Sequence, residues 1–319
     1  MMTTKQLEDL FTVPILFKDN LAIINDSSSF QNQAQTNDSF SEKWVKLDNE
    51  SSTEASEDFQ KKWVLELYGF KTIDGLKDFL KDKKIIIDAG CGIGYKSAWL
   101  AELAPHAIVF GIDYSEAILV AANRYKPISN LYFFRADIAN LPFKPSTLDF
   151  ILCDQVIHHT ENPRKTYEHL SSLLSGDGKF ACYVYAKKAL PRELVDTYFR
   201  TATHKFTHEQ MWQFSDQLTE LGKTLTDLNV KFNCPDIPAL GIKGGEYDIQ
   251  RFIYWNFLKC FYHPQWTKKE NDSCNFDWYS PSNAERYSAD EYKVWANELN
   301  LKIDFFRSEE AGHTSIVSK

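Results

Sequence analysis

Short apolar runs alternate with helix-like segments between residues 83 and 186. These runs lack a polar residue at every second position, which predicts strands that are buried on both faces of a sheet. Apolar strands separated by helices indicate a parallel sheet covered by helices on both sides, with right-handed crossovers. The chain is therefore expected to fold around an α/β, doubly wound sheet. The runs that predict strands are 83–90, 107–113, 131–137, 148–154 and 179–186.

The remaining patterns divide the 319 residues into four segments. A chain of this length holds about two domains, or one domain with large additions. After residue 186 the alternation gives way to an aromatic-rich, mostly helical pattern, which predicts an insertion or lid. The last segment returns to a helix and strands, which would complete a mostly parallel, seven-stranded sheet. The expected segments are an N-terminal extension (1–58), a core (59–186), a helical insertion (187–275) and C-terminal strands (276–319).

The N-terminal extension combines two different patterns. Two short apolar stretches within residues 10–24 flank a Lys-Asp-Asn turn, which predicts a β-hairpin. Residues 25–58 are dominated by Ser, Asn, Gln, Asp and Glu, with isolated aromatic residues. This composition buries too little apolar surface to offset the entropy lost on ordering, so we expect a polar linker or mobile flap.

A glycine-rich turn follows the first apolar run, in the order Asp88-Ala-Gly90-Cys91-Gly92-Ile-Gly94. Glycines at alternate positions let the backbone turn tightly and approach a ligand, and the next helix presents free amide groups to an anion. Ordinary strand-to-helix turns also use glycine, so the turn alone is weak support for a site. A dinucleotide fingerprint would require glycine at the position of Tyr95, which disfavours a nicotinamide oxidoreductase.

Acidic residues end the second and third apolar runs, at Asp113 and Asp137. The carboxyl ends of parallel strands meet at one edge of a sheet, where open α/β folds bind ligands. Each acid alone is more simply explained as a turn or cap residue. Together with Asp88, these residues predict one ligand site at this edge of the sheet.

The pattern Asp88-x-Gly90-x-Gly92-x-Gly94, with the acids that follow, resembles class I S-adenosylmethionine-dependent methyltransferases, most nearly their UbiE-like, type 11 branch. The resemblance covers about residues 59–186 and the C-terminal strands. It implies a Rossmann-like methyltransferase fold and S-adenosyl-L-methionine as the cofactor. It also implies that Asp113 accepts hydrogen bonds from both ribose hydroxyls and that Asp137 and Ile138 contact the adenine. The expected cofactor-binding residues are Asp88, Gly90, Cys91, Gly92, Gly94, Asp113, Tyr114, Asp137, Ile138, Asp154 and Gln155.

Two histidines follow the fourth apolar run and are candidate catalytic residues. An imidazole near its ordinary pKa of ~6.5 can take a proton from an oxygen nucleophile at neutral pH. His158 and His159 lie at the ligand-binding edge of the expected sheet. The alternative is that one histidine caps the loop while the other packs against the next helix.

A second candidate site lies in the helical insertion. Lys243, Tyr247 and Arg251 flank a Gly-Gly pair, and backbone amides with nearby cations can bind a phosphate or carboxylate of the substrate. A surface turn with solvated charges explains the same residues equally well.

Composition limits the expected partners. The 36 Lys and Arg residues against 44 Asp and Glu residues give a net charge of −8, which disfavours nucleic acid. No apolar run approaches the ~18 residues of a membrane span, no secretory signal is evident, and no cysteine pair has metal-site spacing. We therefore expect a cytoplasmic methyltransferase without a metal, which acts on a small-molecule or precursor acceptor at oxygen. The alternatives are an enzyme of the same fold that uses the cofactor differently, or a non-catalytic cofactor-binding adaptor; the sequence carries no signal for an oligomeric state.

Overall fold

A computed structural model describes residues 7–24, 30–48 and 54–319. The chain forms two compact units. The first, here called the core unit, comprises Met1–Ala34, Asp58–Ala186 and Glu285–Lys319. The second, here called the helical unit, comprises Gln35–Glu57 and Lys187–Ala284. The four-segment division expected from the sequence stays a prediction.

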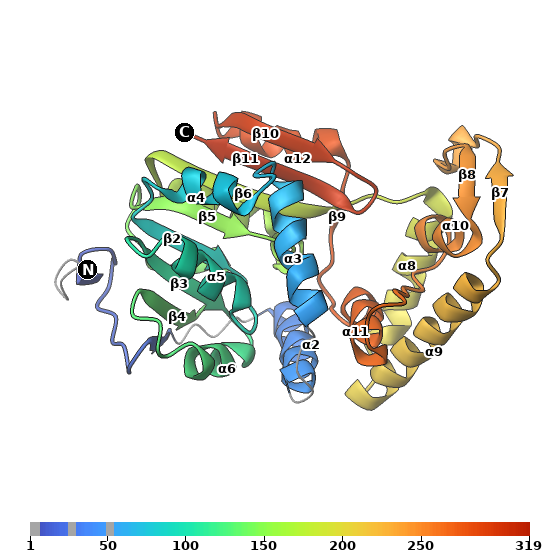
Figure 1. The fold of residues 1–319 in the computed structure, drawn as a ribbon, viewed down its shortest axis with the longest axis horizontal. Helices are drawn as coiled ribbons and strands as arrows, with labels where there is room; N and C mark the ends of the chain where they lie inside the picture. Colours follow the sequence, from blue (N-terminus) through green and yellow to red (C-terminus); the bar gives the residue numbers. More distant parts are fainter. Residues whose placement is uncertain (1–6, 25–29, 49–53) are drawn as a thin grey trace. The chain divides into compact units, whose positions relative to one another are not determined.

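The core unit is built on one large sheet, with the strand order β1-β4-β3-β2-β5-β6-β11-β10 and with β9 paired to β6 (Figure 1). Neighbouring strands from β1 to β6 are parallel, and β11 runs antiparallel to both β6 and β10. The predicted doubly wound, mostly parallel fold is confirmed, and β1 and β9 add to the expected strands. The strands are β1 (Leu21–Ile23), β2 (Ile85–Ala89), β3 (Ile108–Asp113), β4 (Leu131–Arg135), β5 (Leu148–Cys153), β6 (Leu174–Ala186), β9 (Arg286–Tyr287), β10 (Lys302–Ser308) and β11 (Gly312–Ser318).

Apolar clusters cover both faces of this sheet. Along β2, Ile86 packs into one cluster, whereas Ile85 and Ile87 pack into the other. All residues of β2 are buried, which explains the unbroken apolar run in the sequence. Helices α3 (Glu54–Leu67), α4 (Ile73–Leu80), α5 (Tyr95–Leu103) and α6 (Ala117–Arg124) contribute to the first cluster, and α7 (Pro163–Ser172) and α12 (Ala289–Glu298) to the second.

Of the hairpin predicted for residues 10–24, the structure contains the Lys-Asp-Asn turn, closed by backbone hydrogen bonds between Lys18 and Leu21, but not two paired strands. Strand β1 pairs in parallel with β4, and the sole contact of strand type inside this stretch as described is an isolated bridge between Lys18 and Leu21. Phe11 packs instead against the sheet, with its ring centre 5.5 Å from that of Phe134 and 4.9 Å from that of Phe143. Leu10 and Phe11 are therefore buried in the core cluster rather than in a separate hairpin.

The polar linker predicted for residues 25–58 is also corrected, because helix α2 (Gln31–Asp48) forms within it. Its buried side chains are polar: Thr36 and Ser39 are 1% exposed, and Lys43 is 8% exposed. Thr36 and Ser39 hydrogen-bond to the segment after α11, and the Lys43 ammonium lies 2.7 Å from an aspartate of α11. Helix α2 is thus held by polar contacts and lacks the apolar face from which a helix is predicted in a sequence. Residues 25–29 and 49–53 lie outside the described ranges.

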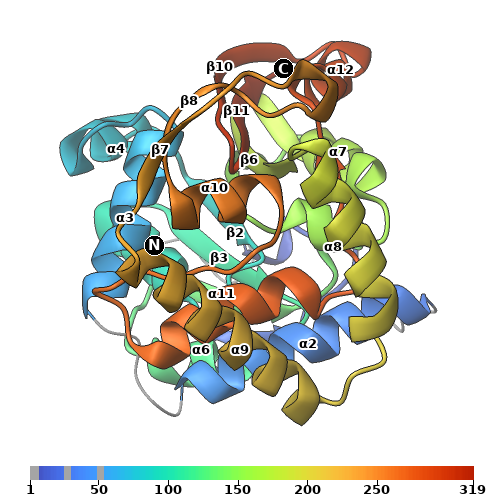
Figure 2. The ribbon, with the colours of Figure 1, turned by 90° about the vertical axis from the view of Figure 1, so that its right-hand side faces the viewer.

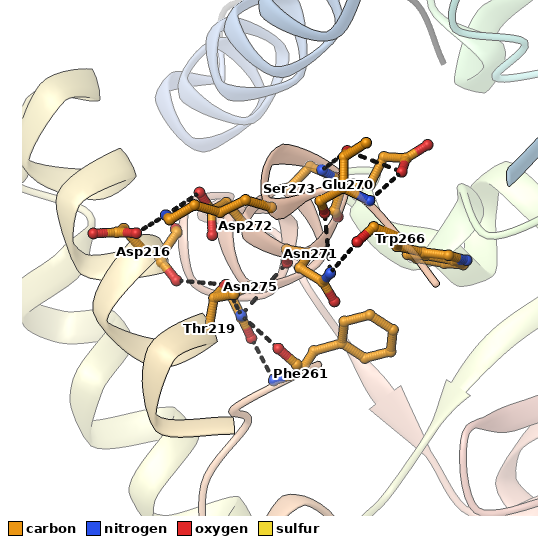
Figure 3. Close-up of polar contacts among 12 residues, drawn as sticks. Asp216, Thr219, Phe261, Trp266, Glu270, Asn271, Asp272, Ser273 and Asn275 are labelled. Carbon is orange, nitrogen blue, oxygen red and sulfur yellow. Dashed lines mark hydrogen bonds and ion pairs between the residues drawn. The ribbon is translucent and has the colours of Figure 1, made fainter. Parts of the chain in front are cut away.

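The helical unit contains the predicted helical insertion together with a two-stranded ribbon. Helix α11 packs on α8 and α9, as does α10 (Figure 2). Polar contacts join α9 and α11, among them the Asn275 amide nitrogen 3.0 Å from the Thr219 hydroxyl (Figure 3). The boundary expected after residue 275 lies inside α11. The elements are α8 (Leu190–Thr203), α9 (His208–Asp227), β7 (Lys231–Cys234), β8 (Gly245–Asp248), α10 (Ile249–Asn256) and α11 (Lys268–Tyr279).

Candidate functional site

The glycine-rich turn lies where the strand order of the core unit reverses. From β2 the chain continues to β3 and β4 on one side, and then crosses to β5 and β6 on the other (Figure 1). Ligands of doubly wound sheets bind at the carboxyl ends of strands at such a reversal. The ends of β2, β3 and β5 therefore define the candidate site.

The turn needs glycine for two physical reasons. Gly90, Gly92 and Gly94 have φ angles of +86°, +55° and +82°, which side-chain-bearing residues rarely adopt. A Cβ atom on Gly90 would also lie 2.3 Å from a methyl group of Val156, in the loop after β5. Helix α5 begins at the end of this turn without a side-chain cap, so its first amide groups are suited to a polar ligand.

Asp113, at the end of β3, is joined directly to the turn. Its Oδ2 accepts a hydrogen bond from the Gly92 amide at 2.7 Å, and its Oδ1 accepts bonds from the Ser115 amide and hydroxyl at 2.8 and 2.6 Å. Burial raises the pKa of Asp113, and these donors oppose the rise. A carboxylate has about four acceptor positions, and the backbone amide of Tyr114 is a fourth donor to Asp113 beside these three. The ribose-binding role of Asp113 stays a prediction.

A buried polar layer lies around the first residues of α5. The Ser97 hydroxyl donates to Asp88 at 2.7 Å, and Asp88 is 1% exposed. The Lys96 ammonium lies 2.9 Å from Oδ2 of Asp154, whose Oδ1 accepts a hydrogen bond from the Tyr68 hydroxyl at 3.0 Å. The layer ties α5 to the ends of β2 and β5.

The two buried carboxylates of this layer differ in their surroundings. Burial raises the pKa of Asp88 to about 6, against the opposing effects of the Lys96 ammonium and the Ser97 hydroxyl. Burial favours neutral Lys96, yet the carboxylate of Asp154 keeps the pKa of Lys96 above its ordinary value. Sequence reasoning missed Lys96, Ser97 and Tyr68. Polar residues in the first turn of an otherwise buried helix were the available signal for the first two.

The other predicted cofactor-binding residues also lie in loops of the core unit. Asp137 caps a short 3₁₀ helix, η1 (Ile138–Asn140), by accepting the Ala139 amide at 2.9 Å. Tyr114 is half-buried. Gln155 has a φ of +63°, a strained conformation for a non-glycine residue that is concentrated at functional loops. Contacts of these residues with a ligand stay predictions.

His158 and His159 lie in η2 (Ile157–His159), directly after the loop that follows β5. Both side chains are buried, with 0% and 5% exposure. The His158 ring centre is 3.7 Å from that of Tyr185, and the His159 ring meets the same tyrosine edge-on at 5.5 Å. The histidines thus pack in an aromatic group of the core unit, and their catalytic role stays a prediction.

The predicted substrate-binding residues belong to the helical unit. Lys243 is exposed, and its carbonyl accepts a hydrogen bond from the Tyr247 hydroxyl at 2.8 Å. The Gly244 amide donates to the carboxylate of Asp236 at 3.1 Å, so an acid of the chain itself binds this turn. A substrate-binding role for Lys243, Tyr247 and Arg251 stays a prediction.

The described ranges contain neither a cluster of metal-ligating side chains nor a helix suited to span a membrane. Within 7–24, 30–48 and 54–319, no three His, Cys, Asp or Glu side chains are grouped as ligands of a metal ion. In the same ranges, no helix has both the length and the apolar character needed to cross a membrane.

Comparisons with known proteins add the family. Residues 80–249 match the family model described as a methyltransferase domain. A tRNA U34 carboxymethyltransferase of Campylobacter fetus is 35% identical over 117 residues, which are 36% of this chain and 41% of that protein. A malonyl-acyl-carrier-protein O-methyltransferase 2 of Coxiella burnetii is 30% identical over 106 residues, 33% of this chain and 43% of that protein. A trans-aconitate 2-methyltransferase of Shigella dysenteriae is 27% identical over 180 residues, 56% of this chain and 62% of that protein.

The chain thus spans less than two thirds of the length of each of these relatives. The family model, by contrast, covers more than half of the 319 residues. The chain therefore belongs to the methyltransferase-domain family, as its resemblance to class I S-adenosylmethionine-dependent methyltransferases predicts.

Proposed function

We propose that the protein transfers a methyl group from S-adenosylmethionine to an oxygen atom of a small-molecule or precursor acceptor. The observation that carries this proposal is the link between Asp113 and the Gly92 amide at 2.7 Å. It joins an acidic strand end to the glycine-rich turn at the reversal of strand order, where a nucleotide-like ligand is expected.

S-adenosylmethionine supplies an activated methyl group on a sulfonium when it is bound. In this proposal Asp113 accepts hydrogen bonds from the ribose hydroxyls, and the glycine-rich turn lets the backbone approach the ligand. Asp137 and Ile138 contact the adenine. Asp88 and Asp154 act as positioning residues, because their hydrogen bonds hold α5 and the loop after β5.

The acceptor is proposed on separate grounds. Two relatives are named for O-methylation of a malonyl group and for methylation of trans-aconitate, both small acids or their carriers. The net charge of −8 disfavours a nucleic acid acceptor. An oxygen nucleophile benefits from a base, for which His158 and His159 are the candidates.

The first test is calorimetry with S-adenosylmethionine and S-adenosylhomocysteine. Both should bind at micromolar concentration or tighter. Asp113→Ala should weaken binding by more than ~1 kcal/mol because a hydrogen-bonded charge is removed, whereas Asp177→Ala, an exposed position, serves as the control. Absence of binding at millimolar cofactor would refute the proposal.

The second test concerns the base. His158→Gln and His159→Gln remove the imidazole but retain a polar side chain. If one of them is the base, its variant should lose roughly 10²–10⁴-fold in kcat at pH 7.5, with unchanged cofactor affinity. Variants that keep full activity would leave the histidines with the packing role alone.

A second candidate function is the transfer of a different group by the same fold. The Campylobacter relative is named for carboxymethyl transfer, which supports this alternative. Mass spectrometry of the ligand that co-purifies with the protein distinguishes the two, because a carboxylated cofactor has a different mass from S-adenosylmethionine. Stoichiometric binding of a partner without any turnover would instead favour the adaptor.

A further inference from the structure

Tyr68 is a buried tyrosine that reaches the candidate site from outside its sequence motifs. It follows α3 directly, and its side chain belongs to a residue that is 1% exposed. Its hydroxyl donates a hydrogen bond at 3.0 Å to Oδ1 of Asp154, which lies 86 positions further along the chain. Burial and the carboxylate of Asp154 raise the pKa of Tyr68, so the hydroxyl keeps its proton and remains a donor.

The backbone that carries Tyr68 is anchored to the sheet of the core unit. The Thr314 hydroxyl of β11 donates to the carbonyl of Leu67 at 2.9 Å. The guanidinium of Arg307, in β10, donates to the carbonyl of Glu66 at 2.9 Å. Tyr68 therefore presents its hydroxyl from a segment that two strands hold in place.

The loop that begins at Asp154 has an unfavourable backbone. Gln155 has a φ of +63°, a conformation that non-glycine residues keep only where their surroundings hold it. The carboxylate of Asp154, one residue earlier, is restrained on both oxygens. Tyr68 donates to Oδ1, whereas the Lys96 ammonium lies 2.9 Å and the Gln155 amide nitrogen 3.4 Å from Oδ2. These donors come from two separate elements and from the loop itself.

The same loop packs directly on the glycine-rich turn. A Cβ on Gly90 would lie 2.3 and 2.4 Å from the two methyl groups of Val156, so the two segments are as close as glycine allows. The turn is held from behind, because the amides of Gly90 and Cys91 donate to the Ile112 carbonyl at 2.7 and 2.9 Å. A shift of Val156 would therefore either press on the turn or leave a void beside it.

We propose that Tyr68 is a positioning residue of the methyltransferase site, which acts through Asp154 rather than by contact with a ligand. Its hydroxyl and the ammonium of Lys96 hold the carboxylate of Asp154. That carboxylate fixes the strained backbone of Gln155 and, with it, the contact of Val156 with the glycine-rich turn. The expected effect on cofactor affinity rests on the proposed function, whereas the effect on the loop does not.

The first test compares two substitutions that each remove one buried hydroxyl. Tyr68→Phe keeps the ring but removes the donor to Asp154. Tyr292→Phe is the matched control, because Tyr292 is 2% exposed and its hydroxyl lies 2.8 Å from the Ser315 hydroxyl, away from the loop after β5. Both variants should melt below the wild type. In calorimetry, Tyr68→Phe should bind S-adenosylhomocysteine at least about fivefold more weakly, and the control within about twofold of the wild type.

Hydrogen exchange of the ligand-free protein reads the loop without any cofactor. Amides of residues 88–94 and 155–159 should exchange at least about fivefold faster in Tyr68→Phe than in the wild type, because the segments that Asp154 holds open more often. Exchange of both segments should be unchanged in Tyr292→Phe.

A second pair of substitutions separates backbone strain from loss of a side chain. Gln155→Gly and Gln155→Ala both remove the amide side chain, but only glycine adopts a φ of +63° without strain. In double-mutant cycles, the loss of affinity and the faster exchange caused by Tyr68→Phe should persist in the alanine background. In the glycine background both effects should fall below about twofold.

Three results would overturn the proposal: exchange that Tyr68→Phe leaves unchanged, equal effects of Tyr68→Phe and Tyr292→Phe, or equal effects of Tyr68→Phe in the glycine and alanine backgrounds. If the wild type does not bind S-adenosylhomocysteine, the proposed function is refuted. The exchange measurements then decide the positioning role of Tyr68 by themselves, because they need no ligand.

Discussion

Replacing Asp88 by asparagine should stabilise the protein at neutral pH. The carboxyl group is 1% exposed, and burial raises its pKa from 3.8 to about 6. A raised pKa means that the folded state holds this proton more tightly than the unfolded state. The contribution of Asp88 to stability is therefore favourable only in acid, and it is lost as the pH rises from about 4 to about 6.

The size of the pKa shift of Asp88 determines how much stability the carboxylate costs. A difference of about two pKa units corresponds to roughly 3 kcal/mol of stability lost at pH 7.5, and to about 1 kcal/mol lost at pH 4.5. Asparagine avoids this loss because its amide is neutral at every pH, and the shift already includes the hydrogen bond from Ser97. The net gain for Asp88→Asn should therefore be roughly 3 kcal/mol at pH 7.5 and about 1 kcal/mol at pH 4.5.

Urea unfolding across pH 4.5–8 measures this gain. Asp149→Asn is the matched control in the same sheet, because that carboxylate accepts the amides of Lys84 and Ile85 at 2.9 and 3.0 Å. The control should lose about 1 kcal/mol. A gain for Asp88→Asn that does not vary with pH, or a loss at pH 7.5, would refute the reasoning. Cofactor affinity should fall in Asp88→Asn, because the carboxylate is proposed to position the glycine-rich turn.

Two further substitutions test the backbone and the ion pair around the same site. Gly90→Ala should lower the free energy of unfolding by roughly 2–4 kcal/mol and abolish cofactor binding, because residue 90 has a φ of +86° and its new Cβ would lie 2.3 Å from a neighbouring atom. Gly176→Ala is the control: a Cβ there has nothing within 4 Å, so the free energy of unfolding in urea should change by less than ~0.5 kcal/mol. Lys96→Met should cost about 3–5 kcal/mol because it leaves the carboxylate of Asp154 buried without its ammonium. Adding Asp154→Asn to Lys96→Met should restore at least half of that loss in a double-mutant cycle, and purely additive losses would contradict the pairing.

The sequence predicts an element correctly where the burial of that element follows from its own residue pattern. Strand β2 is buried on both faces, so its apolar run was sufficient to identify it. Helix α2 was missed because its buried residues Thr36, Ser39 and Lys43 are polar and are satisfied by partners more than 200 positions away. The partner of β1 is likewise β4, more than 100 positions along the chain, whereas hairpin prediction considers only neighbours.

The same distinction applies to the candidate site. Asp113 and the glycine-rich turn could be identified because each has a fixed position relative to the end of its strand. Tyr68 contacts Asp154, and Lys259 contacts Trp278, although the residues of each pair lie in different elements of the chain. No sequence motif has a spacing that would predict either contact. Sequence reasoning therefore found residues at strand ends and missed the buried residues that hold them.

Each of the two units buries charged side chains. In the core unit, the carboxylate of Asp154 lies 2.9 Å from an ammonium, whereas Asp88, which is equally buried, accepts a hydrogen bond from the Ser97 hydroxyl and has a raised pKa. In the helical unit, burial lowers the pKa of Lys188 and of Lys259. Buried charge that reduces stability persists where function requires it. Asp88 is such a charge under the proposal that it positions the glycine-rich turn.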